Sequence, residues 1–465
     1  MALSYCWGKY PFMTTTTKTL NLRKECIKWG ELPKTFQQAI NITRNLKIRY
    51  LWIDALCIIQ DDSQDWEVES PQMSRVYQGS YLTIAANHAI DANAGCFSDT
   101  KWLEKASYEI HPSSSARIRT LYREDHAEFS HAYARKRSSK PLTSRGWALQ
   151  ERLLSPRVIH YMAKELVWEC NTLADCQCKG IHTMGLFKSA YSRVLTGMKD
   201  EAELTHHWIW IIEVYTAQLL TYQIDRLPAL SGLVHQAKQA GAGQYAAGLW
   251  RRNLEHLTCW EVKEKGEATV RHAAYLGPSW SWVNILGVVL YPSVLQQHQI
   301  RAGVQNLILI KDLSVINVSE YSDSLIDASL KISGKYLDAS LSLLTATISG
   351  KPGHLQKSYQ LTTIHGSVYA GFVPDTPINN LWTDVSEIPI KILPWCFSPH
   401  NGGEMLFMVL SSAKDREGID RSISRKGAFE RLGMIKIKGI NNKIKGIEGF
   451  EWYSKATAFE NLIFV

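Results

Sequence analysis

The sequence lacks any apolar run long enough to cross a membrane. Its longest apolar stretches, such as WSWVNILGVVLY at residues 280–291, are about a dozen residues long, whereas a spanning helix needs roughly 20. The N-terminus also has no basic segment followed by an apolar one, which argues against a signal peptide. We therefore expect a soluble, cytoplasmic protein with no membrane partner.

Clustered positive charge is also scarce. The 52 Lys and Arg residues are interspersed with 44 Asp and Glu residues, leaving a net charge of +8. Nucleic-acid binding needs basic side chains gathered on one surface, so no nucleic-acid partner is expected. We interpret the basic loop RKRSSKP at 135–141 as solvated, and the alternating MIKIKGINNKIKGI at 434–447 as a hairpin with one lysine face in water.

Paired cysteine motifs are missing as well. The nine cysteines are irregularly spaced and include no CxxC pair, which is typical of reduced thiols in a chain without a secretory signal. Cys170, Cys176 and Cys178, followed by His182, raise the question of a metal site, but their spacing fits no usual zinc pattern. We predict structural thiols and no bound metal.

The common catalytic signatures are absent too. The sequence has no Walker loop, no HExxH and no GxSxG. The segment GAGQYA at 241–246 matches a variant of the dinucleotide fingerprint, but it follows a helix-like segment, whereas that chemistry needs a strand before the glycine turn. We predict a loop there.

Length and patterning indicate several domains. With 465 residues, 45% of them apolar, the chain can form two or three domains with sizeable cores. Residues 1–170 alternate short apolar runs with helix-like periods, which predicts an α/β fold with a mostly parallel sheet. A mainly helical middle region is expected over 171–265 and a β-rich region over 266–465.

The N-terminal patterns also predict individual elements. Strands are expected at ALSYCWG (2–8), Ile48–Ile53, YLTIAA (81–86), RVIHYM (157–162) and ELVWEC (165–170). Helices are expected over LPKTFQQAINITRNL (32–46), from Ser70, and after a cap at Thr143 or Ser144.

Asp54 is an unusual residue in the apolar segment YLWIDALCIIQDD at 50–62. We expect it near the carboxyl end of a central strand, where open α/β sheets place their ligand crevices. Burying a carboxylate without a partner costs several kcal/mol. Asp54 therefore either faces a crevice or is held by loop amides or an arginine.

A second acidic residue, Glu151, is expected to be partly buried. In the helical segment RGWALQERLLSPR at 145–157, it shares a face with Trp147 and Leu154. A buried carboxylate with a raised pKa can act as an acid or base or stabilise a positive charge on a substrate. A structural ion pair is the alternative, with Arg145, Arg152 or Arg157 as the partner.

Three segments, in this order and spacing, resemble the fungal heterokaryon incompatibility (HET) domain. They are ALSYCWG, LWIDALCIIQDDSQDWEVESPQMSRVYQGSYLTIAA, and SRGWALQERLLSPRVIHY with the following LVWEC. The resemblance covers residues 1–170, and DRLPALSGL, YAAGLW and PSWSW extend it more weakly towards residue 290. It implies a role in nonself recognition, in which fusion of incompatible fungal cells triggers growth arrest and regulated cell death.

The resemblance also implies a distant relation to TIR domains and a TIR-like, flavodoxin-like fold. Some TIR domains hydrolyse NAD with a glutamate beside the nicotinamide ribose, so NAD would be a substrate here and no cofactor is expected. By this analogy, a carboxylate would stabilise the oxocarbenium-like transition state as nicotinamide departs. Glu151 is the first candidate and Asp54 the second. Glu69 is weaker, because Trp66-x-x-Glu69 departs from the Trp-x-x-x-Glu pattern of TIR enzymes.

The enzymatic hypothesis therefore defines a set of site residues. The predicted catalytic residues are Glu151, Asp54, Arg145 and Glu69, and the predicted ligand-contacting residues are Trp7, Trp147, Asp61 and Gln150. A second hypothesis is a non-enzymatic module that assembles with itself or with an incompatibility partner protein. A third is an inactive paralogue, since HET proteins commonly have some tens of residues before the first strand and here that strand opens at the initiator Met.

Overall fold

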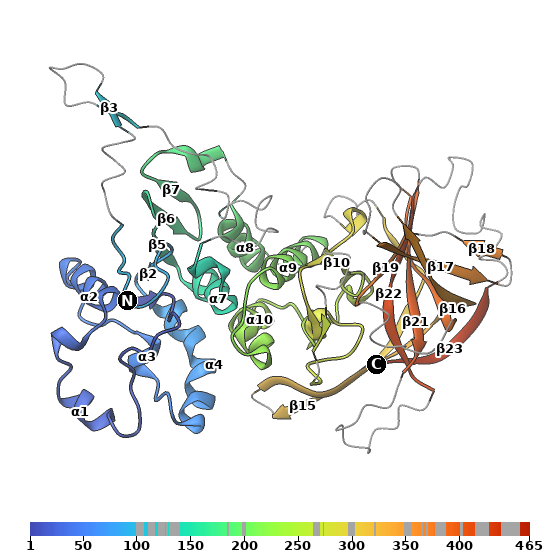
Figure 1. Ribbon diagram of the computed structural model, residues 1–465, viewed down its shortest axis with the longest axis horizontal. Coiled ribbons are helices and arrows are strands. Elements are labelled where there is room, and N and C mark those ends of the chain that lie inside the picture. The colour runs from blue at the N-terminus through green and yellow to red at the C-terminus, as the bar shows by residue number, and fades with distance from the viewer. Residues whose placement is uncertain are drawn as a thin grey trace. The chain divides into compact units, whose positions relative to one another are not determined.

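A computed structural model describes most of the chain (Figure 1). The described residues are 1–98, 107–109, 117–119, 126, 129, 140–183, 186–197, 201–263, 270–272, 274–295, 303–319, 322–347, 355–363, 366–368, 371–376, 387–399, 403–413, 427–438 and 456–465. They form two compact units, Met1–Met198 with Val214–Gly241, and Lys199–Glu213 with Ala242–Val465. The predicted three-part division stays a prediction.

The first unit contains a five-stranded sheet. Its strands, in spatial order, are β1 (Ala2–Ser4), β2 (Thr83–Ala85), β5 (Arg157–Tyr161), β6 (Leu166–Cys170) and β7 (Ala174–Cys176). β1, β2 and β5 are parallel, and β6 and β7 each run antiparallel to the preceding strand. A mixed α/β fold with a largely parallel sheet is therefore confirmed for this unit. A separate pair of short strands is formed by β3 (Ser107–Glu109) and β4 (Arg117–Arg119).

Helices make up much of the rest of this unit. They are α1 (Leu20–Glu25), α2 (Lys34–Asn45), α3 (Asp54–Cys57), α4 (Ser63–Gly79), α7 (Gly146–Leu154), α8 (Phe187–Thr196) and α10 (Ser231–Gln239). Phe36, Ala39 and Thr43 of α2 are buried, as the helical period predicts. Phe36 and Ala39 pack in one core with Leu3 of β1 and Ile84 of β2. α4, α7 and α10 contact one another (Figure 1).

The predicted strand at Ile48–Ile53 is reduced to a single bridge. Trp52 pairs in parallel with Ala2, and its amide donates to the Met1 carbonyl at 2.9 Å. The chain then enters α3 at Asp54, whose Oδ1 accepts from the Ala55 amide at 2.7 Å. A side chain that binds the following backbone amide competes with strand pairing. Asp54 thus lies two residues after Trp52, which pairs with the edge strand β1. The prediction that Asp54 ends a central strand was therefore wrong.

Two predicted helix starts were wrong. α4 begins at Ser63, well before Ser70, because Asp62 caps it by accepting from the amides of Gln64 and Asp65 at 2.9 and 3.3 Å. Pro71 lies inside this helix. The residue before α7 is Arg145, because Thr143 and Ser144 belong to a 3-10 turn (Leu142–Ser144). GAGQYA is a loop that leads into a short strand, as predicted.

The second unit is rich in β-structure, as predicted for the C-terminal region. Its ten-stranded sheet has the path β14 (Gln305–Asn306), β20 (Ile388–Ser398), β21 (Glu404–Ser412), β22 (Phe429–Lys438), β23 (Thr457–Phe464), β16 (Ser322–Thr347), β17 (Leu355–Thr363) and β18 (Gly366–Val368), with β15 (Leu309–Ser319) on β16 and β19 (Gly371–Pro374) on β22. Short pairs are β8 (Tyr245–Ala246) with β9 (Leu249–Trp250), β10 (Glu261–Val262) with β13 (Val289–Leu290), and β11 (Val270–Arg271) with β12 (Ile285–Leu286). Helical structure in the middle of the chain is modest. It comprises α8, α10, α9 (Glu201–Thr216), α11 (Leu254–Leu257) and several 3-10 turns.

A buried ion pair lies within the second unit. The Arg431 guanidinium, fully buried, donates through Nε to Oδ2 of Asp375 at 2.8 Å. It also donates to the Thr258 carbonyl at 2.6 Å and stacks on Trp260, with 3.6 Å from its Cζ to the ring centroid. One side chain therefore connects β22 to the loop that follows α11.

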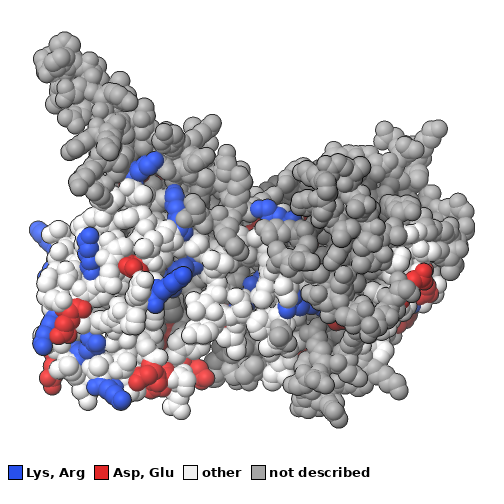
Figure 2. All heavy atoms as spheres, viewed as in Figure 1, with Lys and Arg blue, Asp and Glu red and all other residues white. Residues whose placement is uncertain are grey.

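The surface features expected from composition are partly visible. On the face in Figure 2, acidic and basic side chains of the described residues are intermixed. No helix in the described ranges has both the length and the apolar character of a membrane span. β22 includes the first part of the expected lysine-rich hairpin, but residues 439–447 and most of the basic loop 135–141 lie outside the described residues.

Candidate functional site

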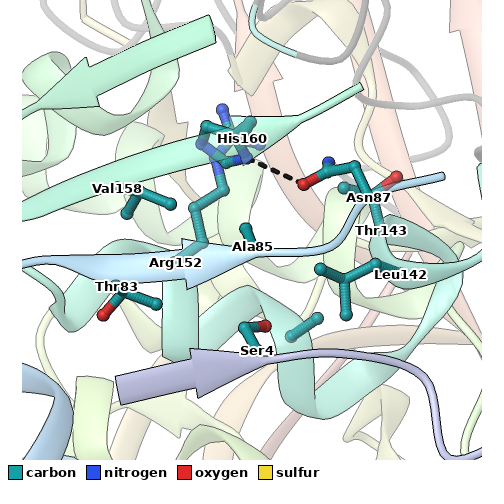
Figure 3. A pocket seen from close by; sticks show the side chains of 10 residues that line it. Ser4, Thr83, Ala85, Asn87, Leu142, Thr143, Arg152, Val158 and His160 are labelled. Carbon is teal, nitrogen blue, oxygen red and sulfur yellow. Dashed lines mark hydrogen bonds between the residues drawn. The ribbon is translucent and has the colours of Figure 1, made fainter. Parts of the chain in front are cut away.

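The candidate site lies where α7 meets the sheet of the first unit. Ser4, Ala85 and His160 come from neighbouring positions of β1, β2 and β5, because Ser4 pairs with Ala85 and Ala85 with His160. Together with Ala148 and Arg152 of α7 they line a small pocket (Figure 3). The open space measures about 10 Å³, which is about the size of a site for one water molecule.

Glu151 is buried next to this pocket. The residue is 4% exposed, and Oε2 of Glu151 accepts a hydrogen bond from the Ser4 hydroxyl. Burial raises the pKa of Glu151, and this effect is opposed by the charge of Arg145 and by the hydrogen bond from Ser4. Glu151 is thus a carboxyl group that is held in a nearly dry environment and has a raised pKa.

Arg145 and Asp54 lie near Glu151. The Arg145 guanidinium donates to the Tyr5 carbonyl. Burial opposes its charge, but the carboxylates of Glu151 and Asp54 raise the pKa of Arg145 above its usual value. Asp54 Oδ2 accepts from the indole Nε1 of Trp7 at 2.8 Å. Four residues predicted from the sequence, Trp7, Asp54, Arg145 and Glu151, are therefore brought together.

Two tyrosines complete this group, which we call the Glu151 cluster (Ser4, Tyr5, Trp7, Asp54, Tyr77, Arg145 and Glu151). Tyr77 of α4 is 1% exposed and donates to the Leu3 carbonyl at 3.1 Å. Burial, and then the charges of Glu151 and Asp54, raise the pKa of Tyr77 well above its usual value. Burial and the charge of Asp54 raise the pKa of Tyr5 in the same way. Sequence reasoning missed Ser4, Tyr5 and Tyr77, although all three lie in the motif segments.

Glu69 lies on α4 outside the hydrogen bonds of the Glu151 cluster. It is half-buried, and its charge acts on Cys57 of α3. Burial is the main cause of the raised pKa of Cys57, and the charges of Asp54 and Glu69 add to it. Glu69 is thus near α3, but it has no contact with Glu151 among those that the structure records.

The other predicted ligand-contacting residues have partners elsewhere. Trp147 Nε1 donates to Asp225 at 3.2 Å, and Gln150 Oε1 accepts from the Gly232 amide at 3.0 Å. Asp61 is exposed, and its carboxylate accepts from the amide and the hydroxyl of Thr17 at 2.7 and 2.8 Å. The contacts of Trp147 and Gln150 join α7 to Asp225 and to α10, and the contact of Asp61 joins two turns of the chain. A role of Trp147, Gln150 or Asp61 in ligand binding stays a prediction.

A second buried polar network lies beside the pocket. Arg152 donates through Nε and Nη2 to the two carboxylate oxygens of Glu169, each at 2.7 Å. His160 lies between Asn87 Oδ1 at 3.0 Å and Glu169 Oε2 at 3.2 Å. Burial opposes ionisation of Glu169, but Arg152 and His160 outweigh it and hold the pKa of Glu169 well below its usual range. Arg152 also stacks on Phe129, with 4.9 Å from Cζ to the ring centroid.

Four side chains that could bind a metal ion lie close together elsewhere in the first unit. They are His126, Glu165, Cys176 and Cys178, whose ligand atoms all lie within 4.8 Å of one another. Of the residues that the sequence singled out for a metal question, Cys176 and Cys178 belong to this group, whereas Cys170 and His182 do not. Sequence reasoning missed His126 and Glu165, because His126 lies 50 residues before Cys176 and Glu165, 11 residues before it, belongs to no usual ligand spacing.

Comparisons with known proteins bear on the first unit. A family model described as heterokaryon incompatibility protein (HET) matches residues 1–151. No curated protein and no solved structure matches the chain. The match includes every residue of the Glu151 cluster, so these residues belong to the part of the chain that the family shares. The N-terminal part of this chain, residues 1–151, is therefore a HET domain.

Proposed function

We propose that this protein acts in the cytoplasm in fungal nonself recognition and that its HET domain, once activated, causes regulated cell death. The support is the family match over residues 1–151, which includes a buried group of charged and aromatic side chains. Activation would come from an incompatibility partner protein or from self-association. The second unit would supply surfaces for recognition, since its sheet lies outside the matched range.

The Glu151 cluster supports a chemical route to cell death, the hydrolysis of NAD. Water would replace nicotinamide at the ribose carbon, giving ADP-ribose, nicotinamide and a proton. Glu151, in its ionised form, would stabilise the positive charge that develops on the ribose as the glycosidic bond breaks. Asp54, which accepts a hydrogen bond from Trp7 at 2.8 Å, would position the Glu151 side chain. The observation that carries this route is a buried carboxyl group whose ionised form is supported by the charge of Arg145 and by the hydrogen bond from Ser4.

Signalling without chemistry is the second candidate, and a different observation favours it. Glu151 is only 4% exposed and is bonded to Ser4, and the adjacent open space is about the size of one water molecule. A dinucleotide would reach Glu151 only after α7 moves away from β1. In this second function the Glu151 cluster holds α7, α4 and β1 together, and assembly transmits the signal.

Induced expression with measurement of NAD and of cell survival separates the two candidates. The full chain is fused to a domain that dimerises on addition of a small molecule, and wild type is compared with Glu151→Gln. Glu67→Gln is the control, because Glu67 is an exposed acid on α4. The chemical route predicts that NAD falls before death in wild type and Glu67→Gln, and that it stays constant in Glu151→Gln at equal amounts of folded protein.

The other outcomes are also informative. Death at constant NAD in wild-type cells would contradict the chemical route and support signalling by assembly. Survival of wild-type cells after dimerisation and after co-expression of incompatible alleles would contradict the proposed cellular role itself.

A further inference from the structure

We propose that His126, Glu165, Cys176 and Cys178 form a zinc site that stabilises the β6–β7 side of the HET-domain unit. This site is separate from the Glu151 cluster and does not depend on the proposed function. We call these four residues the CCHE site. Three of them are buried and Cys178 is half-buried.

Strand pairing places two of the ligands next to the third. β6 and β7 are antiparallel with Val167 opposite Cys176, so the residues that follow Cys176 run back towards Glu165. The Cys178 amide accordingly donates to Oε2 of Glu165 at 3.1 Å. A Cys-x-Cys sequence at the end of one strand and an acid at the start of its neighbour therefore meet because of the register.

The donor atoms converge on one point. Nε2 of His126 lies 2.8 Å from Oε1 of Glu165 and 3.2 Å from Sγ of Cys178. The sulfurs of Cys176 and Cys178 are 3.1 Å apart. With Zn–S bonds of about 2.3 Å and Zn–N bonds of about 2.0 Å, a tetrahedral ion needs separations of roughly 3.4–3.8 Å. Outward shifts of less than about 1 Å would accommodate it.

The surroundings suit an anionic ligand set that needs a cation. Cys176 belongs to a small apolar cluster with Phe129, Met162, Val167 and Ile181. Two thiols and a carboxyl group in such surroundings are costly when charged unless a cation compensates them. Zinc binds thiolate, imidazole and carboxylate together, and four protein ligands make a closed site of the structural type.

The backbone after Cys178 is arranged around its sulfur. The Gly180 amide donates to Sγ of Cys178 at 3.3 Å, a contact that stabilises a thiolate. A Cβ at Gly180 would lie 3.3 Å from this sulfur and 3.3 Å from Cε1 of His126, so glycine allows the backbone to approach both ligands. Lys179, between Cys178 and Gly180 in the chain, has a positive φ of 62°, which turns the backbone sharply.

The CCHE site would also support the pocket beside α7. Phe129, three residues after His126, packs edge-on against His160 with ring centroids 5.0 Å apart and receives the Arg152 guanidinium on its face. Zinc would hold His126 to the β6–β7 pair and thereby keep Phe129 in place over Arg152 and His160. Loss of the metal should lower the stability of this unit, since metal-binding energy contributes to folding.

Metal analysis of the purified full chain tests this inference. Protein produced in zinc-supplemented medium should contain about one zinc per chain, and Cys178→Ser should weaken the affinity for zinc by about tenfold or more. Cys170→Ser is the matched control, because Cys170 lies on β6 outside the CCHE site and should leave the zinc content unchanged. A chelator should lower the melting temperature of wild type and of Cys170→Ser.

Because Cys178→Ser can also fail to fold, a measurement on the wild-type chain is needed. Cobalt exchanged into this protein should show thiolate-to-metal charge-transfer absorption and the visible bands of tetrahedral cobalt. A wild-type chain that takes up neither zinc nor cobalt, a Cys176–Cys178 disulfide in freshly purified protein, or loss of zinc in Cys170→Ser would each overturn the proposal.

Discussion

The Ser4 hydroxyl donates a hydrogen bond to Glu151, a residue 147 positions later in the chain, and thereby joins β1 to α7. Both residues are almost completely buried, since each is 4% exposed. The ionised form of Glu151 is therefore supported by the charge of Arg145 and by hydrogen bonds from Ser4 and Tyr77. This dependence makes the Glu151 cluster sensitive to pH and to the loss of single groups.

Glu151→Gln should flatten the decrease of stability that occurs as the pH rises. Burial raises the pKa of Glu151 above its ordinary value of 4.5, so the folded chain keeps a proton that the unfolded chain releases. The stability gained from the protonated carboxyl is complete below about pH 4.5 and is lost as the pH rises through the folded pKa. Melting temperatures of both proteins, compared between about pH 4 and pH 8, should diverge. Parallel curves would contradict the raised pKa.

Glu169→Gln should be strongly destabilising. The Glu169 side chain is 1% exposed and accepts two hydrogen bonds from Arg152, whose side chain is 11% exposed, so the variant removes the counter-ion of a largely buried guanidinium. Removing one partner of such a pair costs about 3–5 kcal/mol in the free energy of unfolding. Because the pKa of Glu169 is lowered, this stability is present above about pH 4.5 and is lost in wild type as the pH falls.

A surface ion pair provides the control for Glu169. Lys28 and Glu31 are 3.4 Å apart, and their side chains are 79% and 54% exposed. Glu31→Gln should change the free energy of unfolding by less than about 1 kcal/mol, since solvent screens exposed pairs. Urea denaturation of the two variants measures both effects. Equal small changes would show that Arg152 does not depend on Glu169.

Gly232→Ala should destabilise the junction of α10 with α4 and α7. A Cβ at Gly232 would lie 2.7 Å from Leu154 Cδ1, 2.7 Å from Ser74 Cβ and 2.8 Å from Gln150 Oε1, closer than atoms normally approach. Such crowding costs about 1–3 kcal/mol. Gly79→Ala is the matched control, because nothing lies within 4 Å of its Cβ position. A melting temperature of Gly232→Ala equal to that of Gly79→Ala would show that the helices adjust without cost.

Local patterns were sufficient to predict many of the elements in the HET-domain unit. The apolar residues of α2 recur at helical spacing, and RVIHYM and ELVWEC form β5 and β6, because a buried face imposes its period on the sequence. The start of α4 was misplaced because Ser70 and Pro71 form a common start signal. Asp62, which caps the helix in the structure, precedes residues with no clear period.

The arrangement of side chains on α7 was beyond sequence reasoning. Successive residues of a helix point about 100° apart, so Gln150, Glu151 and Arg152 face three different neighbours. These are the Gly232 amide of α10, the Ser4 hydroxyl of β1 and the Glu169 carboxylate of β6. The segment RGWALQERLLSPR contains all three residues, but its sequence does not predict which partner each side chain contacts.

The sequence by itself determined the α/β pattern and the family of the N-terminal part, because hydrophobic period and motif order are local properties of the chain. Only the tertiary structure decided that Trp7, Asp54, Arg145 and Glu151 meet, and that His126 and Glu165 lie beside Cys176 and Cys178. Strand register and helix packing control these encounters. Both result from the burial of many apolar side chains at once, so no single segment contains the information.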